Sequence, residues 1–203
     1  MRLAVFGGTF DPPHNGHLAL CLYARELLDI DRLVISVSNN PLKEAPCSSD
    51  RDRVNMAGLL ADTINCTGNT AEVCSWEVNR GQASYTIDLI AYIEEVYSCR
   101  DITLLIGEDN YRALQQWKSW EELLRRCNFV VFGRTAEKSA EACEAAGLET
   151  RREEKFRHIG FNLPLSSTEL RERISSGEDC SDQMPSPIWR YIVEEGLYRR
   201  AKQ

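Results

Sequence analysis

Residues 7–18, GGTFDPPHNGHL, join a short apolar run at residues 2–6 to residues 17–28, where leucines recur with helical spacing. The apolar run predicts a strand and the leucine spacing predicts a helix. Gly7 and Gly8 let the backbone approach a ligand closely. The start of the helix offers free N–H groups and a positive dipole end to phosphate. The stretch therefore predicts a phosphate-binding turn, although it is neither a Gly-x-Gly-x-x-Gly fingerprint nor a Walker loop.

The same alternation of strand and helix continues along the chain. Near-continuous apolar runs predict strands covered on both faces, and capping residues and glycines delimit the helices between them. Strands are expected at residues 32–38, 71–76, 101–106, 128–132 and 158–161. Helices are expected at residues 50–62, 85–96, 137–146, 166–175 and 186–195. This order predicts an α/β fold, a Rossmann-like doubly wound parallel sheet, in a single nucleotidyltransferase domain over residues 1–203.

Several helices are preceded by a serine that predicts an N-cap. Ser49 stands before the helix at residues 50–62, where Asp50 is an alternative cap, and Ser84 stands before the helix at residues 85–96. Two further serines have a glutamate three residues later, which is the pattern of a capping box. These pairs are Ser119 with Glu122, and Ser166 with Glu169. Each serine hydroxyl is expected to accept a hydrogen bond from a backbone N–H of the first helical turn.

Charge and composition narrow the classes of function. The 203 residues carry a formal net charge of −7, and 43% of them are hydrophobic and 27% charged. An acidic surface disfavours nonspecific binding to nucleic acid or to a membrane. No apolar run reaches the length of about 20 residues that a transmembrane helix needs, and residues 1–6 lack the features of a signal peptide. We therefore expect a cytoplasmic protein, and leave open whether it forms a homo-oligomer.

The eight cysteines fit neither a disulfide framework nor a metal site. There is no Cys-x-x-Cys pair, and most of the cysteines are widely scattered: Cys21, Cys66, Cys74, Cys99, Cys127 and Cys143. In a cytoplasmic chain of this length, such cysteines are expected to be buried apolar residues or free surface thiols.

Two histidines stand within the glycine-rich turn. His14 and His17 are three residues apart, so both side chains share one face if the turn is helical. Imidazoles beside a phosphate-binding turn can donate hydrogen bonds to phosphoryl oxygens. The alternatives are surface or capping roles, or a metal site formed by the pair. His158 is the only other histidine and no acidic cluster surrounds the pair, so zinc would lack ligands. The pair therefore favours phosphate contact.

A second stretch of the same kind lies near the other end of the chain, at residues 165–173, LSSTELRER. The serine and threonine side chains, together with the N–H groups of the helix start, can form a second anion site. Arg171 follows one turn later and can clamp an anion through charge-assisted hydrogen bonds. Taken alone, this stretch is also explained as a plain helix cap.

Together the two stretches resemble the nucleotidylyltransferase superfamily. Residues 14–17 (HNGH) match its His-x-Gly-His hallmark, and residues 8–12 (GTFDP) match the segment before it. Residues 165–171 match its Ile-Ser-Ser-Thr-x-x-Arg signature, with leucine in place of isoleucine. The resemblance implies that His17 contacts the α-phosphate of ATP and stabilises the transition state, and that His14 contacts the α- or the β/γ-phosphates. It also implies ATP and phosphate contacts from Gly7, Gly8, Thr9, Phe10, Ser166, Ser167, Thr168 and Arg171.

Landmarks between the two motifs resemble one branch, the bacterial nicotinate-nucleotide adenylyltransferases. They are residues 40–43 (NPLK), 84–86 (SYT), 107–110 (GEDN), Trp117 and 133–134 (GR). The branch departs from this chain at Leu42, where it has a histidine, and at residues 135–136, where it has Pro-Gly. The resemblance implies phosphate binding by Lys43, recognition of a pyridine carboxylate by Thr86 and nearby amides, and ribose contacts from Asp109. It also implies that Trp117 stacks on the pyridine ring and that Arg134 contacts nucleotide or phosphate. Tyr85 and Gly107 are implied as further nucleotide- or substrate-binding residues.

Two of these assignments have plain structural alternatives. Lys43 can be an ordinary solvent-exposed lysine of a loop. Trp117 can be a core residue, although Trp120, about one turn further on, is the tryptophan that we expect in the core.

The resemblance implies that nicotinate mononucleotide attacks the α-phosphorus of ATP and that pyrophosphate leaves. Mg²⁺ is expected to arrive with ATP rather than in a metal site of the protein. Nicotinamide mononucleotide is an alternative acceptor. Phosphopantetheine is another, although that reaction predicts a shorter chain without the SYT and Trp117 landmarks. A non-catalytic nucleotide-binding regulator is a third alternative, but it would not need both intact motifs.

Overall fold

The computed structural model describes residues 1–40, 45–133 and 155–199. Within these ranges six strands form one sheet in the order β3-β2-β1-β4-β5-β6, and every pairing between neighbours is parallel. This is the strand order of a doubly wound nucleotide-binding sheet, so the predicted fold class is confirmed. The strands are β1 (Leu3–Gly8), β2 (Arg32–Val37), β3 (Ala71–Cys74), β4 (Ile102–Gly107), β5 (Cys127–Gly133) and β6 (Phe156–Gly160).

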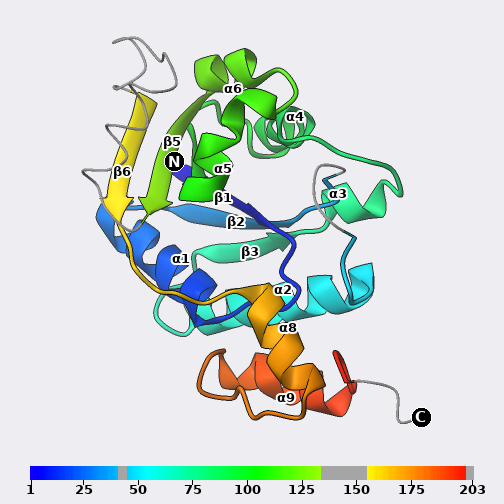
Figure 1. The fold of residues 1–203 in the computed structure, drawn as a ribbon. Helices are drawn as coiled ribbons and strands as arrows, with labels where there is room; N and C mark the ends of the chain where they lie inside the picture. Colours follow the sequence, from blue (N-terminus) through cyan, green and yellow to red (C-terminus); the bar gives the residue numbers. More distant parts are fainter. Residues whose placement is uncertain (41–44, 134–154, 200–203) are drawn as a thin grey trace.

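Helices cover both faces of the sheet (Figure 1). One side carries α1 (Asn15–Leu28), α2 (Asp50–Asn65), α8 (Ser167–Ser175) and α9 (Ser186–Glu194). The other side carries α4 (Thr86–Tyr97), α5 (Glu108–Arg112), the 3-10 turn η1 (Leu114–Gln116) and α6 (Trp120–Arg126), while the short α3 (Trp76–Asn79) follows β3. No helix in the described ranges is long and apolar enough to cross a membrane.

The two hydrophobic cores follow from the two-residue repeat of the strands. In β1, Ala4 and Phe6 face the core beneath α1, α2, α8 and α9, whereas Leu3 and Val5 face the core beneath α4, α5 and α6. Successive side chains of a strand point to opposite faces. A strand buried on both faces must therefore be apolar at nearly every position, which is the pattern that predicted these strands.

The carboxyl ends of β1 and β4 define where a ligand can bind. From β1 the chain proceeds outward to β2 and β3, and it then returns to the other side of β1 as β4. Such a reversal of strand order opens a crevice at the carboxyl edge of a parallel sheet. The phosphate-binding turn leaves β1 at this edge, and α5 begins directly after β4. The topology therefore places the first sequence motif at the expected binding position.

Several predicted caps differ in the structure. Ser49 does cap α2, accepting from the N–H of Asp52. The Ser84 hydroxyl instead donates to the buried carboxylate of Glu77 at 2.6 Å, and Tyr85, not Ser84, occupies the N-cap position of α4. Ser119 occupies its N-cap position with φ 53 and makes no side-chain cap, because this bond requires an extended backbone.

Three further expectations concern Ser166, the helix predicted at residues 137–146 and the cysteines. Ser166 is the N-cap residue of α8, but its side chain makes no cap hydrogen bond and lines the cleft described below. The predicted helix at residues 137–146 lies outside the described residues, as does Cys143. The described cysteines are all free, as predicted, and four of them are buried: Cys21, Cys74, Cys127 and Cys180.

Candidate active site

A cleft of about 980 Å³ lies at the carboxyl edge of the sheet, and both sequence motifs line it. The first motif contributes Gly7, Gly8, Thr9, Phe10, His14 and His17. The second contributes Ser166, Ser167, Thr168 and Arg171, and the end of β4 contributes Gly107 and Asp109. Residues about 150 positions apart in sequence thus share one cavity, which is the spatial arrangement that a single triphosphate would require.

The two motifs also touch each other directly. The Ser167 hydroxyl donates to the carbonyl oxygen of Pro12 at 2.9 Å. Arg171 Nη1 donates to the carbonyl oxygen of Asp11 at 2.7 Å. The start of α8 is therefore fixed against the turn that follows β1, and the two helix N-termini that open onto the cleft cannot move independently.

The two histidines form reciprocal caps at the start of α1. The Gly16 N–H donates to His14 Nδ1 at 3.1 Å, and the His14 N–H donates to His17 Nδ1 at 3.2 Å. Their rings stack with centroids 3.8 Å apart. Because Nδ1 accepts in both rings, each neutral imidazole carries its hydrogen on Nε2. This tautomer can donate from Nε2 to a phosphoryl oxygen.

Burial sets the charge of His14. The side chain is only 6% exposed, and desolvation lowers its pKa from 6.5 to about 4, because a buried imidazole resists protonation. Gly16 makes this packing feasible, since a Cβ there would lie 2.9 Å from the His14 ring. His14 is therefore a neutral hydrogen-bond donor at pH 7, and the third position of the HNGH sequence needs a glycine.

The lowered pKa of His14 makes stability depend on pH. The folded value, about 4, is below the ordinary value of 6.5. The unfolded chain therefore binds more protons between these values, and stability is lost as pH falls from 6.5 towards 4. Between pH 7.5 and pH 5 we expect the unfolding free energy to fall by about 2 kcal/mol more in the wild type than in His14→Asn. Asparagine retains an N-cap acceptor. Urea unfolding at both pH values measures the difference, and parallel losses would contradict the prediction.

Aromatic packing supports His17 from behind. The Phe10 ring is buried, and its centroid lies 5.4 Å from that of His17 in an edge-on arrangement. Phe10 has φ 52, a left-handed conformation that is unusual for a bulky residue. A Cβ on Gly8 would lie 2.8 Å from this ring, whereas a Cβ on Gly7 would meet open space. Gly8 is thus needed for packing, and Gly7 keeps the wall of the cleft open.

A smaller cavity adjoins the cleft, and two of the residues predicted to contact the acceptor line it. Thr86 and Trp117 line it, and Gly7 and Asn110 line both cavities. Tyr85 lines neither of the two; its ring lies under Lys118 Nζ, 4.7 Å from the centroid. The structure therefore brings Thr86 and Trp117 to one place beside the main cleft, and leaves Tyr85 next to it.

The expectation for Trp120 is wrong. Both tryptophans are partly buried, and of the two only Trp117 packs against the second core. One face of Trp117 can thus belong to the core while the residue lines the smaller cavity. Asp109 is exposed at the start of α5. Lys43 and Arg134 lie outside the described residues, so their roles stay predictions.

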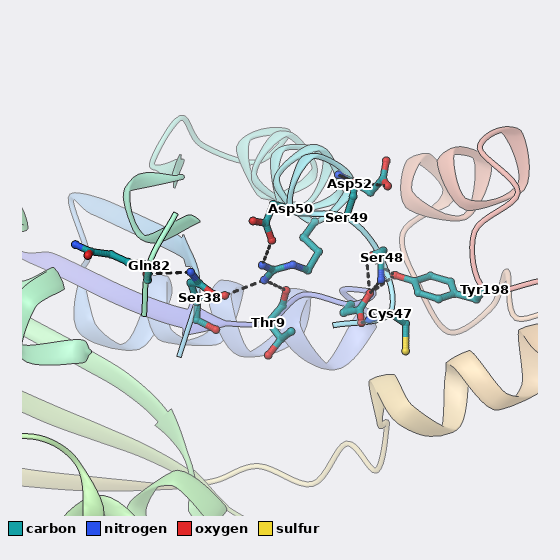
Figure 2. A network of polar contacts seen from close by, with 12 residues as sticks. Thr9, Ser38, Cys47, Ser48, Ser49, Asp50, Asp52, Gln82 and Tyr198 are labelled. Atoms are coloured by element: carbon teal, nitrogen blue, oxygen red, sulfur yellow. Dashed lines mark hydrogen bonds and ion pairs between the residues drawn. The ribbon is translucent and has the colours of Figure 1, made fainter. Parts of the chain in front are cut away.

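Sequence reasoning missed a buried arginine that holds the turn after β1. Arg53 is 1% exposed, and its Nη1 donates to the carbonyl oxygens of Thr9, at 3.1 Å, and Ser38, at 2.9 Å (Figure 2). Nη2 pairs with Asp50. The guanidinium therefore ties the end of β1 to the end of β2. A signal was present, because residue 53 stands on the same helical stripe as the buried Met56, Ala57, Leu60 and Ile64.

Two buried acids were also missed. Glu77, 3% exposed, accepts from the hydroxyls of Ser36 and Ser84 and lines the smaller cavity. Asp11 is likewise 3% exposed and lines the main cleft. Sequence alone gives little warning here, because acidic residues in loops are usually solvated. Among the described residues, no group of three or more His, Cys, Asp or Glu side chains is arranged to hold a metal ion.

Comparisons with known proteins agree with this geometry. A family model described as cytidylyltransferase-like matches residues 5–173. The chain is 66% identical over 199 residues to a protein of Chlorobium phaeobacteroides (strain BS1) named "Probable nicotinate-nucleotide adenylyltransferase", covering 98% of this chain and 100% of that one. It is 52% identical to a protein of the same name from Prosthecochloris aestuarii, covering 98% of each.

Solved structures show the same fold at low sequence identity. Nicotinic acid mononucleotide adenylyltransferase of Plasmodium falciparum, complexed with NaAD, superposes with a TM-score of 0.73 at 18% identity, covering 97% of both chains. The same enzyme complexed with APC superposes with a TM-score of 0.69. Because the family model spans most of the chain and the named relatives match it almost end to end, the chain belongs to the cytidylyltransferase-like family, in its nicotinate-nucleotide adenylyltransferase branch.

Proposed function

We propose that this protein transfers the adenylyl group of ATP to nicotinate mononucleotide, giving deamido-NAD and pyrophosphate, a step of NAD biosynthesis. One observation carries the proposal: the HNGH turn and the start of α8 line a single cleft, and a smaller cavity with Thr86 and Trp117 adjoins it. The names of the full-length relatives point to the same reaction. So does the P. falciparum neighbour, whose structure contains NaAD.

The chemistry needs little from the protein beyond positioning and charge. The attacking phosphate of the mononucleotide is already an anion, so no strong general base is required, and catalysis rests on alignment and stabilisation of the transferring phosphoryl group. His14 supplies a neutral N–H donor, His17 supplies a second ring N–H, Arg171 supplies positive charge, and the N-termini of α1 and α8 add oriented N–H groups. In this proposal His17 faces the α-phosphate. Gly7, Thr9, Ser166 and Thr168 surround the ATP phosphates.

Mg²⁺ belongs to this proposal as a companion of the nucleotide. Mg²⁺ retains much of its hydration and is commonly held by substrate phosphates. We therefore treat Mg·ATP as the substrate. The ion would supply charge neutralisation on the phosphate oxygens, while the protein residues orient the chain of phosphates.

The start of α4 favours an acidic pyridine over its amide. Thr86 is the first residue of this helix, and the N-cap residue Tyr85 makes no side-chain cap hydrogen bond there. The N–H groups of the first turn are thus suited to an anionic ligand, because the helix dipole favours negative charge at this end. We assign this position to the carboxylate of nicotinate, with Trp117 stacked on the ring and Asp109 near the ribose.

Pyrophosphate release from Mg·ATP tests the proposal, with nicotinate mononucleotide, nicotinamide mononucleotide and phosphopantetheine compared side by side. Turnover is expected to be fastest with nicotinate mononucleotide. Faster turnover with either other acceptor would contradict the substrate assignment. ATP binding without turnover of any acceptor would favour a nucleotide-binding regulator. One domain over residues 1–203 and a cytoplasmic location remain predictions.

A further inference from the structure

A buried carboxylate with no part in this chemistry lies where the two motifs meet the C-terminal segment. Asp11 accepts from the N–H groups of Cys47, at 2.7 Å, and Ser48, at 3.2 Å. It also accepts from the Ser48 hydroxyl and from the Tyr198 hydroxyl at 2.8 Å. Figure 2 shows Tyr198 pointing at Ser48 and Cys47 from the C-terminal segment. Neutral donors from two distant segments therefore surround this carboxylate.

Arg171 lies next to the same carboxylate but does not close on it. Its Nη1 donates to the Asp11 carbonyl oxygen at 2.7 Å and is 3.9 Å from Asp11 Oδ2. Its Nη2 donates to the Thr168 hydroxyl at 3.2 Å. A closed arginine–carboxylate pair has N–O distances of about 2.7–2.9 Å and is often bidentate. The guanidinium is therefore held by the backbone carbonyl of Asp11, while its charge interacts only weakly with the Asp11 carboxylate.

The Tyr198 hydroxyl is well suited to act as a lasting donor. Burial, and after it the negative charge of Asp11, raise the pKa of Tyr198, so its proton is retained throughout the working pH range. Its partner oxygen, Asp11 Oδ1, is the one that also accepts from Ser48. Tyr198 lies beyond residues 5–173, the span of the family model. Its hydroxyl contacts Asp11, which lines the cleft.

From this arrangement we propose that Tyr198 is a positioning residue for ATP binding, which keeps Asp11 from capturing the Arg171 guanidinium. The inference rests on the proposed function in one respect, the assignment of Arg171 to the triphosphate. Without the tyrosine hydroxyl, the Asp11 carboxylate loses a donor at Oδ1, and among the described residues Arg171 is the cation that lies beside its other oxygen, Oδ2, at 3.9 Å. A closed Arg171–Asp11 pair would then compete with the phosphates of ATP.

The first test is Tyr198→Phe in the full chain, with ATP binding measured by calorimetry in the absence of acceptor. We expect the dissociation constant for ATP to rise by about tenfold, the scale of one lost hydrogen bond to a charged group. In turnover assays the KM for ATP should rise while kcat at saturating ATP stays near that of the wild type. An ATP affinity equal to that of the wild type would overturn the proposal.

Tyr191→Phe is the matched control. The Tyr191 hydroxyl on α9 donates to Asp52 at 2.8 Å and accepts from Asn55 at 2.9 Å, and none of these three residues lines the cleft. This variant also removes a tyrosine–carboxylate hydrogen bond between the C-terminal region and α2. We expect a comparable loss of thermal stability but unchanged ATP affinity. If both variants weakened ATP binding equally, the effect of Tyr198 would be merely structural and the proposal would be wrong.

A double variant separates competition from general damage. In Asp11→Asn the side chain is neutral and no longer competes for the guanidinium, so adding Tyr198→Phe should change ATP affinity by less than about threefold. A further tenfold loss would show that the tyrosine acts by some other route. Because the titration contains no acceptor, a wild-type protein that binds ATP but does not use nicotinate mononucleotide would refute the proposed function and leave this comparison intact.

Discussion

Replacing His17 with alanine is expected to lower kcat for pyrophosphate release by about 10²–10³-fold, the scale of one lost transition-state donor. The ring is only partly buried, and its Nδ1 accepts the His14 N–H at 3.2 Å, so Nε2 carries the hydrogen that can be donated to a phosphoryl oxygen. The fold should survive, because the second reciprocal bond, from Gly16 to His14, is untouched. Steady-state kinetics gives the rate, and circular dichroism checks the fold.

One further variant tests which nitrogen of His17 matters, and a second serves as a control. His17→Asn can still accept the His14 N–H through its side-chain oxygen but has no donor at the position of Nε2, so it should be as slow as the alanine variant. His158→Ala is the control, because His158 is a partly buried histidine on β6 that does not line the cleft. Near-normal turnover in His17→Ala, or an equal loss in His158→Ala, would remove His17 from the mechanism.

The largest expected effect on stability comes from Arg53→Met. Methionine fills much of the same space but leaves the carbonyl oxygens of Thr9 and Ser38 without their donor. A buried acceptor left without its donor costs about 1–3 kcal/mol, and these two acceptors are partly buried, so we expect the unfolding free energy to fall by about 2–5 kcal/mol. ATP binding should weaken as well, because Thr9 lies in the wall of the cleft. Urea unfolding with the midpoint and slope fitted together measures the first effect.

Arg32→Met provides the comparison for Arg53. Arg32 pairs with Glu72 at 2.8 Å, but its side chain is 45% exposed, and ion pairs in such positions contribute less than about 1 kcal/mol. Similar losses in the two variants would mean that Arg53 contributes only as an ordinary surface charge. A much larger loss for Arg53 supports its role as the tie between β1 and β2.

The sequence predicts the fold well for a simple physical reason. A parallel strand covered on both faces must be apolar at nearly every position, and residues 102–107 and 127–133 satisfy this condition so fully that their ends were placed within one residue. The glycine-rich turn is also readable, because its glycines, its histidine spacing and the following helix all favour the same ligand. Local chemistry and global fold agree in these places.

The prediction fails where a distant side chain decides the outcome. The Ser84 hydroxyl donates to Glu77, and only the folded chain brings this carboxylate within 2.6 Å of it. Trp117 and Trp120 are equally apolar in the sequence, yet only Trp117 packs against the second core. These outcomes depend on contacts between elements, and the spacing of residues along one helix does not predict such contacts.

The hydrogen bonds that join Ser167 to Pro12 and Arg171 to Asp11 span 155 and 160 residues of the chain. Neither half of the polypeptide forms the nucleotide site alone. A partly synthesised or unfolded chain therefore cannot bind a triphosphate. Nucleotide binding should consequently report on completion of the whole fold, and bound ATP should protect the enzyme against proteolysis and heat in proportion to its concentration. A growing polypeptide on the ribosome would therefore not bind ATP until its last major helices had packed against the rest of the fold.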